Sequence, residues 1–230
     1  CGYPAGQGPT QWCGRGTRQP SGENATGGLQ RADGPRRVGA KDGTLWKGDA
    51  AEWMGWLNVV EKMESQEGQL RSLARAGRAY ADAVLLGMGG SSLGPDVLLN
   101  TFGKIAGYPR LQVLDSTDPE TVAAVTKSLD LPATLFIVAS KSGGTTETLS
   151  QFAHFWELVA KVSKKPGEQF DAITDPGTSL EKLARAHTFR WVFHGRPDVG
   201  SRHPVLSHLA MGPAAAAGSA SRGQPARPPA

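Results

Sequence analysis

The chain has 230 residues, of which 39% are hydrophobic and 20% charged, which is enough for one globular domain. This composition excludes a collagen-like or wholly disordered chain, and no apolar run reaches the roughly 18 to 20 residues that a membrane-spanning helix needs. The net charge of +4 is modest, and without a secretory signal pattern we expect a soluble, cytoplasmic protein that does not bind membranes.

The first 43 residues contain 11 Gly and 4 Pro and almost no aliphatic periodicity, so we expect a disordered leader over residues 1–43. The leader carries a net charge of +3, whereas residues 44–212 carry −1, and no stripe of basic and aromatic residues there indicates nucleic-acid binding. Cys1 and Cys13 both lie in the leader, which favours a reducing compartment and predicts neither a disulfide framework nor a metal site. Because the chain begins with Cys rather than Met, we interpret it as a piece of a longer protein.

Helical and strand signals alternate through the middle of the chain. Helical spacing occurs over Trp53–Met63, after Pro95, from Asp118-Pro119-Glu120 onward and from Thr145 onward. Between these segments lie five short apolar runs typical of strands buried on both faces of a sheet: Val84–Met88, Leu111–Leu114, Thr134–Ala139, Phe170–Ile173 and Phe189–Phe193.

Strands that alternate with helices predict right-handed crossovers and a three-layer α-β-α sandwich, an α/β fold with a five-stranded parallel sheet. We place this domain at residues 44–212. The rest of the chain, residues 213–230, is rich in Gly, Pro, Ala and Arg, so we expect a disordered tail there.

Two of the predicted strand-to-helix loops are rich in Gly and hydroxyl residues. The first covers residues 87–94, and the second covers Ser140–Thr146. Loops of this kind meet at the carboxyl ends of parallel strands, where ligands bind. Their glycines let the backbone approach a ligand closely, and backbone amides, hydroxyls and the ammonium of Lys141 supply donors. The pair therefore predicts a site for one phosphate group.

Other interpretations of these loops remain open. Either loop could be only a tight turn. The dinucleotide-binding fingerprint fails because Ser92 stands where its third glycine belongs, and no Gly-Lys-Ser/Thr tripeptide supports a nucleotide P-loop. Residues 90–94 do match the G-x-S-x-G motif of serine hydrolases, with Ser92 as nucleophile and a histidine as base: His187, His194, His203 or His208. This alternative is the least favoured, since residues 87–89 separate the motif from its strand.

The two loops in this order resemble the phosphate loops of the sugar isomerase domain family, and within it the glucose-6-phosphate isomerases. Asp198–Arg202 and Val205–Ser207 resemble that family's stretch around a catalytic arginine. Leu45-Trp46 and Trp53–Leu57 are similar to the start of the isomerase half in bacterial transaldolase–isomerase fusions. The likeness covers residues 44–218 and identifies the chain as the amino-terminal part of such an enzyme.

This resemblance implies that the intact protein interconverts glucose 6-phosphate and fructose 6-phosphate in glycolysis and gluconeogenesis, without a metal or other cofactor and as a homo-oligomer. Gly90 and Ser91 would bind the sugar phosphate or its neighbouring hydroxyls, and Arg202 would stabilise negative charge on the enediolate. The rest of the phosphate cradle would come from the hydroxyls of Ser140, Ser142 and Thr145 and the backbone of Lys141, Gly143 and Gly144.

The chain departs from the family pattern in several places. Residues flanking Arg202 differ, and Gly144 replaces a common Thr. The family's glutamate base, ring-opening histidine and terminal lysine have no counterpart here, so we expect this chain alone to bind a sugar phosphate weakly and turn over little. The alternative hypothesis is a non-catalytic sensor of sugar phosphates. Glu64 is not expected to replace the missing base, because it precedes the first loop and falls on the wet face of a predicted helix.

Overall fold

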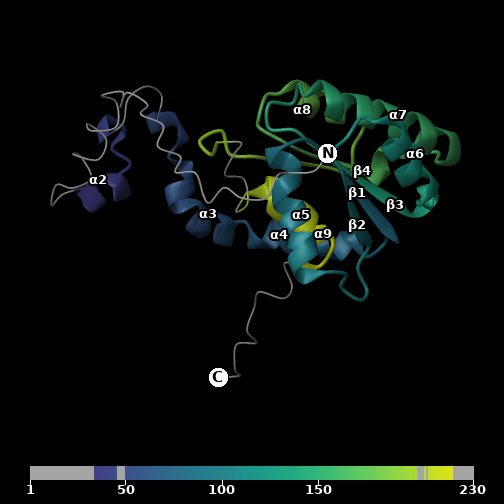
Figure 1. The fold of residues 1–230 in the computed structure, drawn as a ribbon, viewed down its shortest axis with the longest axis horizontal. Coiled ribbons are helices and arrows are strands. Elements are labelled where there is room, and N and C mark those ends of the chain that lie inside the picture. The colour runs from purple at the N-terminus through teal and green to yellow at the C-terminus, as the bar shows by residue number, and fades with distance from the viewer. Residues whose placement is uncertain (1–33, 46–49, 201–204, 206, 220–230) are drawn as a thin grey trace, which may run out of the picture. The chain divides into compact units, whose positions relative to one another are not determined.

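The computed structural model describes residues 34–45, 50–200, 205 and 207–219 (Figure 1). The chain divides into two compact units, of which the first ends at Ala51 and the second begins at Glu52. The first contains the helix α2, Gly34–Gly39, and a 3-10 turn at Gly43–Leu45. Because α2 is helical, the expectation of disorder throughout residues 1–43 is wrong for its last part.

A five-stranded parallel sheet forms the centre of the second unit. Its strands are β1 Asp82–Gly87, β2 Arg110–Leu114, β3 Thr134–Ala139, β4 Phe170–Thr174 and β5 Trp191–His194. They lie in the order β2-β1-β3-β4-β5, and all four neighbouring pairs are parallel. The predicted α/β fold with a five-stranded parallel sheet is therefore confirmed. Every residue of β1 and β3 is buried, which explains their unbroken apolar sequences.

Helices cover both faces of the sheet, as Figure 1 shows. Side chains at alternate positions of β1 point to opposite faces, so Leu85 packs in a cluster with Leu73 and Leu209, while Leu86 packs in another cluster with Phe155 and Leu180. The helices of this unit are α3 Val59–Ser65, α4 Glu67–Gly77, α5 Gly90–Phe102, α6 Pro119–Lys127, α7 Thr146–Val162, α8 Ser179–Ala186 and α9 His208–Ala216, with 3-10 turns at Gly55–Asn58, Leu131–Ala133 and Pro166–Gln169. A further 3-10 turn, Ala50–Trp53, contains the point at which the two units divide.

The order of the sheet places a switch point between β1 and β3. From β1 the chain crosses to β2 on one side, and from β2 it crosses back over β1 to β3 on the other. Helices that follow β1 and β3 therefore leave in opposite directions, and ligands of open α/β sheets bind in the crevice that this reversal creates. The two Gly-rich loops follow these two strands.

The predicted disordered tail begins too early. Residues 213–216 continue α9 and are buried, so the domain extends beyond residue 212. Because α9 is buried on nearly all sides, its sequence has no amphipathic period. Its run of small residues therefore resembled a low-complexity tail. Small side chains are required here, because a Cβ on Gly77 would lie 2.6 Å from the Ala216 carbonyl oxygen and one on Gly94 would lie 2.8 Å from Cβ of Ala210.

We expect His208 to make the stability of this unit dependent on pH. It is buried at the start of α9 and stacks on Phe193 with ring centroids 5.8 Å apart. Burial lowers the pKa of His208 below its ordinary value of 6.5. Near and below pH 6.5 the unfolded chain therefore binds more protons than the folded chain does. As the pH falls through this range, the free energy of unfolding should decrease by at most about 1.4 kcal/mol per pH unit.

Urea unfolding at pH values between about 7.5 and 5 measures this effect. His208→Phe should flatten the dependence on pH. His154→Gln, at an exposed position of α7, should leave the dependence unchanged. An equal loss of stability with acid in the wild type and in His208→Phe would contradict the assignment.

Candidate functional site

The two Gly-rich loops begin side by side. Gly87, the last residue of β1, is paired in register with Ala139, the last residue of β3. A Cβ on Gly87 would lie 3.2 Å from the Ala139 carbonyl oxygen, so the strand ends approach closely because Gly87 has no side chain. The helix α5 starts three residues beyond Gly87, at Gly90, and α7 starts at Thr146. Both helix N-termini therefore lie at the switch point.

The loop after β1 is shorter than the sequence suggested. Only Met88 and Gly89 separate β1 from α5, and Pro95 lies inside the helix instead of at its start. Gly89 has φ +54° and ψ −118°, a backbone conformation that other residues rarely adopt. No side chain caps this N-terminus. Because Gly90 is the first residue of the helix, its amide has no acceptor within the helix.

Ser91 and Ser92 lie in the first turn of α5 and are both buried. Ser92 is 1% exposed, and its hydroxyl donates a hydrogen bond to the Gly89 carbonyl at 3.0 Å. A nucleophilic serine must instead stand exposed at the strand end beside a base, so the hydrolase interpretation of Ser92 is wrong. Gly94, the last residue of that motif, is small because α5 packs there against Ala210.

Ser140 organises the loop after β3. It is buried, and its hydroxyl accepts a hydrogen bond from the Gly143 amide at 3.1 Å and lies 2.9 Å from the hydroxyl of Thr145. Gly143 has φ +72°, and a Cβ there would lie 2.5 Å from that of Thr178. The Ser179 hydroxyl also donates to the Gly143 carbonyl at 2.6 Å. These contacts hold the loop in one shape, with Ser142 and Gly144 exposed at its surface.

The N-terminus of α7 has no side-chain cap. Thr145 occupies the capping position, but its side chain bonds no helix amide. The Leu149 amide donates to the Thr145 carbonyl at 3.0 Å, so the amides of residues 146–148 precede the first intrahelical donor. These amides and the dipole of a 17-residue helix present partial positive charge at the loop.

The helices that follow β2 and β4, in contrast, have N-termini that are capped by side chains. In α6, the Asp118 carboxylate accepts from the Thr121 amide at 2.8 Å, and this bond lowers the pKa of Asp118. In α8, the Thr178 hydroxyl accepts from the Glu181 amide at 3.3 Å, and the Glu181 carboxylate accepts from the Gly177 amide at 2.6 Å. Open N-termini thus occur after β1 and β3, the two strands that flank the switch point.

The ammonium of Lys141 does not face the loop as a free cation. It forms an ion pair with the carboxylate of Asp175, which follows β4, and donates to the carbonyls of Arg196 at 3.3 Å and Pro197 at 3.4 Å. The expectation that this ammonium contacts a phosphate stays a prediction, and here the ammonium bonds one carboxylate and two backbone carbonyls instead. Asp175 was missed because it stands 34 residues beyond Lys141 in an Asp-Pro-Gly sequence that reads as a simple turn.

Among the remaining candidate residues, the structure describes His187, His194, His208 and Glu64. Arg202 and His203 lie outside the described residues. His187 packs against Trp156, with ring centroids 4.6 Å apart, and the Nε2 atom of His194 lies 3.1 Å from Glu181. Glu64 is exposed on α3, as expected.

The described residues form neither a metal centre nor a membrane span. Over residues 34–45, 50–200, 205 and 207–219, no three His, Cys, Asp or Glu side chains gather as metal ligands would. The same parts of the chain contain no helix with the length and apolar character needed to cross a bilayer.

The sheet order and the paired open helix N-termini define an α/β protein with a candidate anion site at the switch point of its sheet. The family model of phosphoglucose isomerase matches residues 44–219. The chain therefore belongs to the phosphoglucose isomerase family.

Curated relatives agree with this assignment, and solved structures have a similar fold. The chain is 34% identical over 177 residues to glucose-6-phosphate isomerase of Carboxydothermus hydrogenoformans, covering 72% of this chain and 38% of that one. It is 32% identical over 175 residues to a glucose-6-phosphate isomerase of Thermus thermophilus, covering 75% and 41%. The crystal structure of hypothetical protein TT0462 from Thermus thermophilus superposes with a TM-score of 0.69 at 29% identity, covering 86% of this chain and 46% of that one.

A glucose-6-phosphate isomerase from Chlamydia trachomatis has a similar fold, with a TM-score of 0.56 at 24% identity over 78% of this chain and 36% of that one. The chain thus spans less than half the length of each of these relatives.

Proposed function

We propose that the protein acts in the interconversion of glucose 6-phosphate and fructose 6-phosphate and that this chain supplies the phosphate-binding part of the active site. One observation carries the proposal: two uncapped helix N-termini, of α5 and α7, start beside each other at the switch point of the sheet. Such a pair of N-termini attracts a dianion. Membership of the phosphoglucose isomerase family and the names of the relatives support a sugar phosphate as the ligand.

The phosphate oxygens would accept hydrogen bonds from both helices. From α5, the amide of Gly90 is the proposed donor, and Ser91 lies directly behind it. From α7, the amides of the first turn would bind together with the exposed hydroxyl of Ser142 and the hydroxyl of Thr145. The roles of Gly143 and Gly144 are to keep the loop backbone close to the ligand, and the buried hydroxyl of Ser140 positions that loop.

The described residues would bind and orient the substrate for a proton transfer between its first two carbons. Holding the phosphate far from the reacting carbons lets binding energy orient the reacting end of the sugar. Arg202 is the proposed partner of the negative charge that develops on the enediolate. The acid and base of the reaction are not assigned to any of the described residues, and exposed Glu64 is not proposed for that role.

Removing two hydroxyls from the proposed cradle tests the binding step. Ser142→Ala combined with Thr145→Ala should weaken binding of fructose 6-phosphate by about 3 kcal/mol or more, because each hydrogen bond to a charged partner contributes roughly 1.5 to 3 kcal/mol. Isothermal titration calorimetry measures the change. Ser163→Ala, at the opposite end of α7, is the matched control and should leave the affinity unchanged.

Unchanged affinity in the double variant would remove the cradle assignment. An isomerase assay on the longest natural form of the protein distinguishes an isomerase from a non-catalytic sensor of sugar phosphates. Turnover that is lost in Arg202→Ala supports the isomerase. Binding of fructose 6-phosphate with no turnover in that form would instead indicate the non-catalytic sensor.

A further inference from the structure

A polar cluster joins the ends of three neighbouring strands next to the proposed phosphate site. Lys141 follows β3, Asp175 follows β4, and residues 195–198 follow β5. The Lys141 carbonyl accepts from the Asp175 amide at 3.1 Å, and their side chains form the ion pair described above. The same ammonium reaches the carbonyls of Arg196 and Pro197. We call the side chains of Lys141 and Asp175 the clamp.

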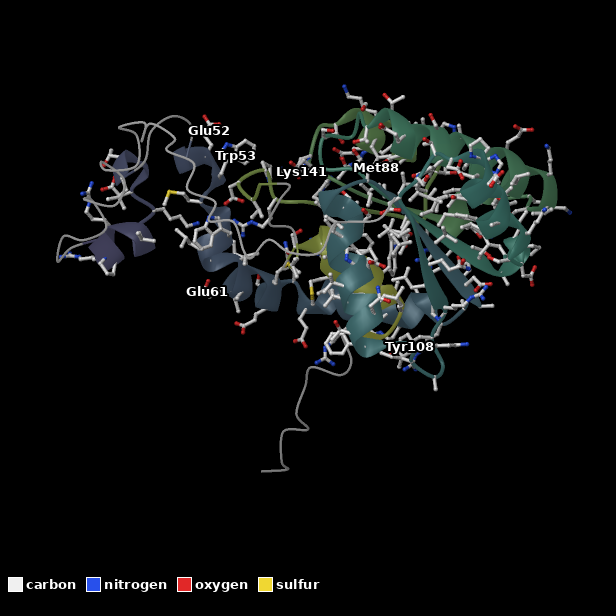
Figure 2. The ribbon with its side chains drawn as sticks, in the orientation of Figure 1. Glu52, Trp53, Glu61, Met88, Tyr108 and Lys141 are labelled. Carbon is white, nitrogen blue, oxygen red and sulfur yellow. The ribbon has the colours of Figure 1, made fainter. Side chains whose placement is uncertain are left out.

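The clamp is largely shielded from water. The side chain of Lys141 is 14% exposed and that of Asp175 is 15% exposed. A Cβ on Gly195 would lie 2.5 Å from Oδ1 of Asp175, so the carboxylate packs directly against the backbone after β5. The Lys141 ammonium also lies 5.7 Å from the centre of the Trp53 ring, and Figure 2 shows these two side chains together. Moving the ammonium onto a phosphate would leave a shielded carboxylate without its cation, which is unfavourable.

The backbone held by the clamp is also fixed from its other side. The Gly55 amide donates to the Asp198 carbonyl at 2.8 Å, and Met54 and Val199 form an antiparallel bridge. A Cβ on Gly55 would lie 2.3 Å from Cγ of Asp198, so the Asp198 carboxylate packs directly against the Gly55 backbone. The Arg196 guanidinium in turn bonds the Asp198 carboxylate. Residues 196–199 are therefore held on two sides.

We propose that Lys141 and Asp175 are positioning residues that couple the phosphate loop to the segment after β5. Lys141 is adjacent in sequence to the exposed Ser142 of the loop, while its ammonium holds two carbonyls of residues 196–199, which lead directly to Arg202. The clamp thus links the phosphate loop to the backbone from which the chain continues to Arg202. This inference rests on the proposed function, in which Arg202 meets the reacting end of the substrate.

Two ligands separate positioning from direct phosphate binding. Inorganic phosphate uses only the cradle, whereas fructose 6-phosphate also extends along the positioned segment. In Lys141→Met and Asp175→Asn, calorimetry should show the dissociation constant for inorganic phosphate within about threefold of the wild type and that for fructose 6-phosphate raised about tenfold or more. Lys141→Arg keeps the charge and the donors and should restore most of the difference. Lys161→Met removes an exposed ion pair with Glu157 and should change neither constant.

Two calorimetric results would overturn the inference. An equal loss of about tenfold or more for both ligands would make Lys141 a direct phosphate ligand. Unchanged affinities for both ligands, with only a lower melting temperature, would make the clamp purely structural.

If the wild type binds neither ligand, the proposed function is contradicted. Amide hydrogen exchange then still tests whether the clamp positions residues 196–199. In Lys141→Met, exchange should then rise at the amides of Val199 and Gly55, which bond the carbonyls of Arg196 and Asp198, and stay constant at the Leu149 amide of α7. Unchanged exchange at Val199 and Gly55 would refute the positioning role.

Discussion

Thr145→Asp is expected to weaken phosphate binding strongly while the fold becomes no less stable. Aspartate is a strong capping residue, and at this position its carboxylate would accept hydrogen bonds from the first amides of α7, as Asp118 does in α6. The amides proposed to hold the phosphate would then be occupied, and the added negative charge would repel the ligand. We expect binding of fructose 6-phosphate to weaken about 100-fold or more, with the free energy of unfolding raised by about 0.5 to 1 kcal/mol.

Calorimetry and urea unfolding measure the two effects on the same samples. Thr145→Ser keeps the hydroxyl that contacts Ser140 and should behave as the wild type in both measurements. The opposite signs of the expected changes make the result specific, since a variant that merely misfolds would lose stability as well as binding. Retained binding in Thr145→Asp would mean that the phosphate lies elsewhere.

Arg190→Met is expected to destabilise the fold strongly. The Asp171 carboxylate of β4 is only 1% exposed, and burial raises its pKa. Arg190 opposes this shift with two hydrogen bonds to the carboxylate, one of them 3.0 Å long from Nε to Oδ1. Without Arg190 the buried charge is uncompensated, so the free energy of unfolding should fall by about 3 to 5 kcal/mol at neutral pH.

Urea unfolding again provides the measurement. Arg71→Met removes an exposed ion pair with Glu67 on α4 and should cost about 0.5 kcal/mol or less. Combining Arg190→Met with Asp171→Leu removes both charges and should recover a large part of the loss. Similar small costs for Arg190→Met and Arg71→Met would show that the Asp171 carboxylate is not isolated from water.

The sheet could be predicted from the sequence because its strands are buried on both faces. Thr134–Ala139 has no polar residue after its first position and forms β3 with the predicted bounds. The start of α5 could not be predicted from the sequence. Glycine is unfavourable inside a helix, and proline usually marks a first turn, so Pro95 indicated a helix that begins later than Gly90. The last strand begins at Trp191 instead of Phe189, because Phe189 packs on Phe170 with ring centroids 5.3 Å apart before the sheet pairing begins.

The position of the candidate site could be predicted for a similar reason. Alternating strands and helices place the loops after β1 and β3 at one edge of the sheet, and their glycines indicate a close backbone approach. The partner of Lys141 could not be predicted, because the contact with Asp175 depends on how β3 and β4 pair. Likewise, residues 213–216 lack the periodicity that marks a helix with one wet face, so the sequence does not reveal their burial.

A crystal structure of the protein with fructose 6-phosphate tests the central claim most directly. We predict that the phosphorus atom lies between the N-termini of α5 and α7, with its oxygens within hydrogen-bond distance of the Gly90 amide and of amides in the first turn of α7, and that the Lys141–Asp175 ion pair stays intact. A phosphate bound away from these two N-termini, or one bound to a Lys141 ammonium released from Asp175, would contradict the account.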